Sequence, residues 1–118
     1  MTVMLDKGTP VYLRLRDCIS ASILTGQYHD GDLLPSVRAF AAEHGANPLT
    51  VAKAYHSFQE DGLVVVKRGI GMFVAEGATA RLMIEGRKRF LEEYWPRVRE
   101  MMDLLDIDPQ EMLARELA

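Results

Sequence analysis

The fold is decided by residues 34–62, LPSVRAFAAEHGANPLTVAKAYHSFQEDG. Ser36 is placed to cap a first helix, and Gly45 is a residue type that commonly ends one. Asn47 and Pro48 then repeat the pattern of a helix start, with a capping side chain followed by a first-turn proline. The two predicted helices are separated by a tight turn of three residues, which is typical of a helix-turn-helix.

An amphipathic helix is predicted before this stretch, over residues 9–26. Thr9 is expected to be its N-cap, Pro10 its first residue and Gly26 its end. Apolar residues recur at helical spacing and predict one buried stripe. Its members are Val11, Leu15, Ile19, Ile23 and Leu24.

A β-hairpin is predicted after the second helix of the decisive stretch. Residues 63–68 are strand-like, Gly69-Ile70-Gly71 forms a tight turn, and residues 72–75 return. Lys67 and Arg68 lie at the expected tip. A helix-turn-helix followed directly by a hairpin is winged, so one helix can enter the major groove of DNA while the wing lies over adjacent phosphates or the minor groove.

The last part of the chain is predicted to be a helical tail. Residues 78–106 have helical spacing, Pro96 is expected to kink or restart the helix, and Asp108-Pro109 signals a final short helix with an acidic cap. A tail alone is too small to bury its wide apolar stripe, which therefore predicts a homodimer interface in preference to a ligand pocket. The stripe consists of Phe90, Leu91, Tyr94, Trp95, Val98, Met101, Met102 and Leu105.

These patterns together predict a mainly α protein with a small β-hairpin. Residues 1–76 are expected to form a winged helix-turn-helix domain, and residues 77–118 a helical dimerisation tail. The chain has 118 residues, of which 48% are hydrophobic and 26% are charged, and this composition suits a globular protein.

Composition also excludes several classes of protein. The single cysteine, Cys18, permits no internal disulfide and is interpreted as a core residue in preference to a redox sensor. The three histidines lack metal-ligand spacing, and no nucleophile–base–acid set is visible. We therefore expect no metal, no cofactor and no enzymatic activity. No apolar stretch is long enough for a signal peptide or a membrane span, so a cytoplasmic location without a membrane partner is expected.

The net charge of −3 and the pI of about 5.6 argue weakly against nucleic-acid binding. Because binding depends on whether Lys and Arg gather on one face, the acidic excess can lie elsewhere. A winged-helix module that acts through protein–protein contacts remains the alternative.

Four motifs carry a resemblance to a known family. The chain resembles the GntR family of transcription regulators from Pro10 to Val74, and the Asn-Pro-x-Thr-Val-x-Lys-Ala-Tyr form with a short tail is most similar to the YtrA-type subfamily. The resemblance implies a homodimer that binds an inverted-repeat operator in double-stranded DNA, with repression as the expected outcome. It implies a tail with at most a small or interfacial ligand site, and a small-molecule effector that the sequence does not identify stays open. The motifs are residues 34–41, 47–55, 61–64 and 68–74.

The resemblance also implies which residues contact DNA. Ser36, Arg38 and Lys53 are expected at phosphates, and Asn47, Pro48, Leu49 and Thr50 at the bases, although for Asn47 a purely capping role stays open. Asparagine can recognise adenine, and threonine can contact the thymine methyl group. The wing is expected to contact DNA through Lys67, Arg68, Gly69 and Gly71.

Overall fold

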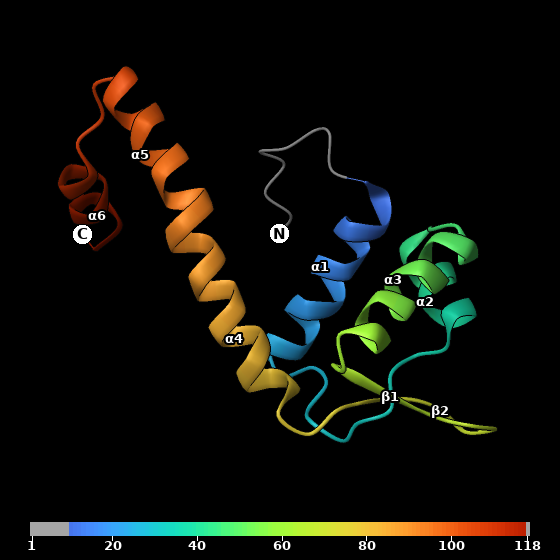
Figure 1. The fold of residues 1–118 in the computed structure, drawn as a ribbon. Coiled ribbons are helices and arrows are strands. Elements are labelled where there is room, and N and C mark those ends of the chain that lie inside the picture. The colour runs from blue at the N-terminus through green and yellow to red at the C-terminus, as the bar shows by residue number, and fades with distance from the viewer. Residues whose placement is uncertain (1–9, 118) are drawn as a thin grey trace. The chain divides into compact units, whose positions relative to one another are not determined.

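The computed structural model describes residues 10–117 and confirms the mainly α architecture with one antiparallel hairpin (Figure 1). The chain divides into two compact units, residues 1–82 and 83–118. The division predicted between residues 76 and 77 stays a prediction. The elements are α1 (Val11–Leu24), α2 (Val37–His44), α3 (Pro48–Glu60), β1 (Val64–Lys67), β2 (Gly71–Val74), α4 (Ala78–Arg89), the π-helix η1 (Phe90–Tyr94), α5 (Trp95–Leu104) and α6 (Pro109–Leu117).

The first helix, α1, differs from its prediction at both ends. Thr9 lies outside the described residues, and Pro10 precedes the helix with extended backbone in place of being its first residue. Val11 and Leu24 are exposed, which corrects the predicted stripe. Val11 is the first helical residue, a full turn before the first buried position, and Leu24 is the last. The stripe that packs into the core consists of Leu15, Ile19 and Ile23.

The core of the first unit lies mainly between α1 and α3. The predicted inner face of α3 is confirmed, because Val51, Ala54, Tyr55 and Phe58 are all buried. Their spacing follows the helical period, so a single stripe meets the stripe of α1. Further members come from the other elements of the unit, namely Leu34, Phe40, Ala41, Leu63, Val64, Val74, Ala78 and Leu82.

The predicted hairpin is present, with Val64 opposite Val74 and Lys67 opposite Gly71. Its second strand begins at Gly71, a residue that was predicted to lie in the turn. Leu33, in the loop before α2, adds an isolated bridge to Phe73. Gly71 has a φ of 148°, and a Cβ atom built there would lie 2.9 Å from Leu33 Cδ1. Only glycine therefore permits this close approach of the hairpin to the loop.

Within the second unit, the end of α4, η1 and α5 form a continuous helical rod (Figure 1). Pro96, which was predicted to kink or restart the helix, lies in the first turn of α5, directly after a π-helical turn. Because proline has no N–H group, it donates no hydrogen bond to that preceding turn. The π-helical turn immediately before it was not predicted. In that turn the Trp95 N–H donates to Phe90 O, five residues earlier.

The last helix, α6, begins at its predicted acidic cap, where Asp108 Oδ1 accepts a hydrogen bond from Gln110 N at 2.9 Å.

Among the helices of residues 10–117, none has both the length and the apolar character that crossing a bilayer requires.

Candidate nucleic-acid interface

The N-terminus of α2 is capped as predicted. Ser36 Oγ accepts a hydrogen bond from Ala39 N at 3.1 Å, and Gly45 ends the helix in the left-handed conformation. Ser36 stays exposed, and so does Arg38 in the first turn. The cap leaves the other N–H groups of that turn without intrahelical acceptors, and such groups are natural partners for a phosphate.

The N-terminus of α3 presents an apolar side chain to solvent. Asn47 Oδ1 accepts a hydrogen bond from Leu49 N at 2.8 Å, so the capping role that the sequence left open for Asn47 is present. Recognition of adenine by asparagine uses both the amide oxygen and the NH₂ group, and here the oxygen is already engaged. Leu49 is 81% exposed and Thr50 is half-buried. Leu49 and Thr50 are therefore the better candidates for contact with base edges.

Tyr55, on the buried face of α3, links α3 to α2. Its hydroxyl donates to Pro35 O at 2.7 Å, just before α2 begins, and its ring meets Phe40 of α2 edge-on at 5.9 Å. Burial, which disfavours the phenolate, is the main cause that raises the pKa of Tyr55 to about 12. Helical spacing placed Tyr55 in the core, but this bond to a residue 20 positions away left no signal in the sequence.

Both lysines that were predicted to contact DNA lie over aromatic rings. Lys53 Nζ lies 4.3 Å from the ring centroid of Tyr12 in α1, and Lys67 Nζ lies 4.5 Å from that of Phe73 in β2. Cation–π attraction at exposed sites is worth about 0.5–1 kcal/mol. Each ring holds its ammonium group in one region. The lysine side chains therefore have less conformational entropy left to lose if they bind DNA.

The charges of the chain are distributed unevenly along the sequence. Residues 1–82 hold eight Lys or Arg and eight Asp or Glu, whereas residues 83–118 hold six and nine, so the net charge of −3 arises in the second part. In the first unit, Arg16 forms an ion pair with Asp61. Over residues 10–82, the exposed basic side chains that have no carboxylate partner are Arg38, Lys53, Lys67 and Arg68.

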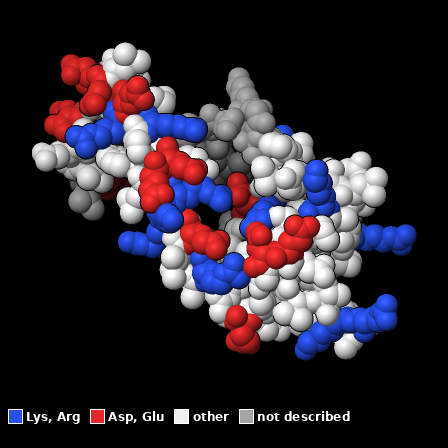
Figure 2. All heavy atoms as spheres, viewed as in Figure 1, with Lys and Arg blue, Asp and Glu red and all other residues white. Residues whose placement is uncertain are grey.

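The surface view shows where such charges gather. The right-hand edge of Figure 2 is the region where Figure 1 places α2 and the tip of the hairpin. Basic side chains project there among uncharged ones, and no acidic side chain is visible at that edge. A local basic surface thus exists despite the acidic pI. It is this local field, and not the net charge, that a phosphate backbone would meet.

Other site chemistry is not apparent in the described part of the chain. Over residues 10–117 no group of three His, Cys, Asp or Glu side chains is arranged to hold a metal ion. Cys18 is half-buried in α1 and forms no disulfide.

Comparisons with known proteins agree with this geometry. The family model described as "Bacterial regulatory proteins, gntR family" matches residues 11–74. The HTH-type transcriptional repressor YtrA of Bacillus subtilis is 36% identical over 86 residues, a match that covers 73% of this chain and 65% of that protein.

Two solved structures place the fold among such regulators. A GntR family transcriptional regulator from Listeria monocytogenes superposes with a TM-score of 0.73 at 28% identity, covering 93% of this chain and 95% of that one. The crystal structure of AraR(DBD) in complex with operator ORX1 gives a TM-score of 0.55 at 25% identity, covering 64% and 92%. The matched family, YtrA and the Listeria structure are described as regulators, which confirms the prediction of a regulator in place of an enzyme.

Proposed function

Because the chain belongs to the gntR family of bacterial regulatory proteins, we propose that it is a transcription regulator that binds an inverted-repeat operator in double-stranded DNA as a homodimer. The observation that carries this proposal is the exposed start of α3, where Leu49 is 81% exposed, in a unit whose residues 10–82 also present four exposed basic side chains without a carboxylate partner. The similarity to AraR(DBD), which was crystallised with its operator, supports the same interpretation.

Each part of this surface has a separate role in the proposed complex. The start of α3 enters the major groove, where Leu49 and Thr50 contact base edges and thymine methyl groups and Pro48 packs beside them. The amide nitrogen of Asn47 remains able to donate, because only the oxygen serves the cap. Ser36, Arg38 and Lys53 bind phosphates and fix the register of the protein on the duplex.

The wing completes the contact with each half-site. Lys67 and Arg68 lie on adjacent phosphates, and Gly69, with a φ of 79°, lets the tip turn without a side chain in the way. Gly71 contributes through the packing of the hairpin on Leu33. Sequence discrimination therefore comes from α3, while the wing adds salt-dependent affinity.

A homodimer is proposed because the second unit exposes an extensive apolar surface. Of the predicted interface stripe, Tyr94, Trp95, Val98 and Met102 are half-buried, whereas the other members remain at least half exposed. Contiguous apolar surface of this kind is unusual on a monomer and is covered when two copies pack symmetrically. The exposed members of the stripe are Phe90, Leu91, Met101 and Leu105.

We further propose that the protein is a repressor located in the cytoplasm. YtrA of Bacillus subtilis is named as a repressor, and a bound dimer would block access of polymerase to an overlapping promoter.

Selection of bound sequences from a random duplex pool tests the function directly. We expect a palindromic consensus whose half-sites lie about one helical turn apart. Affinity for the selected duplex should fall steeply with salt, because each neutralised phosphate contributes about 0.9 to the slope. No enrichment over the starting pool would refute DNA recognition, and a consensus without two-fold symmetry would refute the homodimer. Salt-independent capture of a protein partner would favour a protein–protein module.

A further inference from the structure

The first turn of α4 is held by a carboxylate from a distant loop. Asp30, in the loop after α1, accepts hydrogen bonds from Gly77 N at 2.8 Å, from Thr79 N at 3.1 Å and from Thr79 Oγ1 at 2.7 Å. The bond from the Thr79 side chain, followed by those from the two backbone N–H groups, lowers the pKa of Asp30. The backbone donors are of the kind that a helix start leaves without intrahelical partners, so Asp30 serves as a cap across 49 residues.

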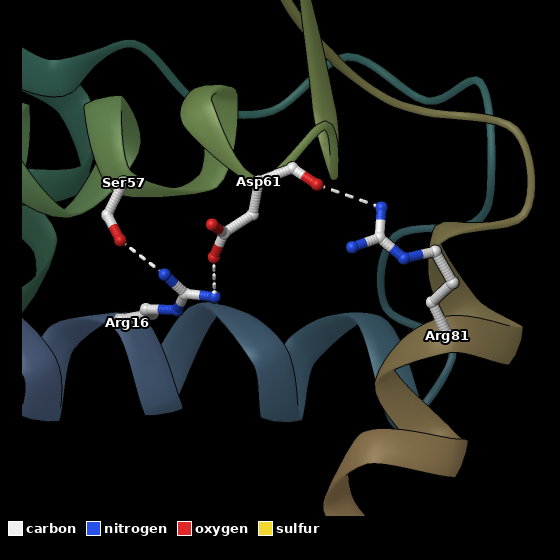
Figure 3. A network of polar contacts seen from close by, with 4 residues as sticks. All are labelled: Arg16, Ser57, Asp61 and Arg81. Carbon is white, nitrogen blue, oxygen red and sulfur yellow. Dashed lines mark hydrogen bonds and ion pairs between the residues drawn. The ribbon is translucent and has the colours of Figure 1, made fainter.

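A second contact holds the same turn from the end of α3. Arg81 Nη1 donates to Asp61 O at 2.9 Å, while the Asp61 carboxylate accepts from Arg16 of α1 (Figure 3). Arg16 also donates to Ser57 Oγ and lies over the ring of Phe58, 4.9 Å from its centroid. Three helices, α1, α3 and α4, therefore meet at Asp61.

Apolar burial completes the attachment. Ala78 and Leu82 of α4 belong to the buried core of the first unit. The first turn of α4 is thus fixed on one side by Asp30, on another by Asp61 and beneath by the core. Within the first unit, this turn is thereby attached to the loop after α1 and to the end of α3.

We propose that Asp30 and Arg81 are positioning residues that set the half-site spacing accepted by the homodimer. This inference rests on the proposed function. The chain reaches the apolar residues of the second unit through α4, so a fixed first turn limits how far apart and at what rotation two α3 helices can be presented. One added base pair moves a half-site by about 3.4 Å and rotates it by roughly 35°, which a rigid attachment does not follow.

The test uses the full chain and duplexes built from the selected half-site. Binding is measured to one duplex with a single half-site and to a series in which the spacing of two half-sites changes by one or two base pairs. The variants are Asp30→Ala, Arg81→Ala and the pair together. Arg87→Ala, which removes the same charge from an exposed position of the same helix, is the matched control, and Asp30→Asn retains a capping oxygen.

Wild type and Arg87→Ala are expected to lose on the order of tenfold or more in affinity when the spacing changes, because two-site avidity of about 10²–10⁴ is lost when geometry forbids simultaneous binding. The double variant should lose less than about threefold across the series while binding the single half-site as wild type does. Asp30→Asn should restore most of the spacing preference.

Several results would overturn the inference. The double variant could keep the spacing profile of wild type, or wild type itself could show no spacing preference. The double variant could also lose affinity equally for single and paired half-sites, which would indicate a purely structural role. If the double variant does not fold, Thr79→Val removes only the hydroxyl bond to Asp30, and a profile identical to wild type would then count against the inference. Failure of wild type to bind any duplex would instead refute the proposed function.

Discussion

Replacing Leu91 by aspartate is expected to separate the proposed homodimer. The Leu91 side chain is 58% exposed in one copy, and full burial of a leucine is worth about 1.5–3 kcal/mol, so covering the exposed part stabilises by about 1–1.5 kcal/mol per copy. Two-fold symmetry counts this contribution twice, which gives roughly 2–3 kcal/mol, or about 30–150-fold in the dimer dissociation constant. Desolvation of the new carboxylate raises the expected loss further.

Sedimentation over a series of protein concentrations measures the effect. Leu91→Asp should be monomeric at concentrations where wild type is dimeric, and its affinity for a palindromic duplex should approach that for a single half-site. Leu49→Asp is the matched control, since it places the same charge on an exposed leucine at the start of α3 and should spare the dimer while weakening DNA binding. Circular dichroism checks that both variants are folded. A Leu91→Asp protein that dimerises like wild type would refute the interface.

Three further predictions concern single side chains. Arg38→Ala should weaken binding to all duplexes about equally and reduce the salt slope by about 1, and a loss confined to one sequence would contradict the phosphate role. Thr50→Ala should relax base preference within a half-site when the selection is repeated, and unchanged selectivity would exclude Thr50 from recognition. Tyr55→Phe, which leaves Pro35 O without its donor, should lower the free energy of unfolding by about 1–2 kcal/mol in denaturant titrations near neutral pH. Because the folded pKa of Tyr55 is raised to about 12 from 10.0, its contribution is fully present below pH 10 and is lost as the pH rises towards 12. The phenylalanine variant should lack that part of the decline, and parallel curves for the two proteins would contradict it.

Signals that act within a few residues were sufficient to predict much of the fold. The caps at Ser36 and Asn47 have their partners three and two residues away, and Gly45 adopts the left-handed conformation that its position as a helix end requires. Such contacts depend on local backbone geometry alone, so residue type and spacing reveal them. The inner face of α3 was predictable for the same reason, because its period is fixed by the helix.

Contacts between distant residues were not predictable in this way. The bond from Thr79 to Asp30 joins residues 49 apart, and the pair of Arg16 with Asp61 joins residues 45 apart. Each of these side chains is also an ordinary exposed or capping residue by its local pattern. The packing of Gly71 against Leu33 was not predictable either, since a glycine in a hairpin turn already has a local explanation.

The wide turn η1 fixes the rotational phase of the helical rod in the second unit. A π-helical turn accommodates about one more residue than an α-helical turn, and one residue corresponds to roughly 100° of rotation. Deleting a single residue between Phe90 and Tyr94 would therefore turn η1 into an ordinary α-helical turn and leave Trp95, Val98 and Met102 at nearly the same azimuth relative to Met83, whereas a deletion in the α-helical part of the rod would rotate them by roughly 100°. The turn η1 thus absorbs one residue of chain length without rotating the apolar face that follows it, and this part of the rod tolerates a one-residue difference in length that its α-helical parts do not.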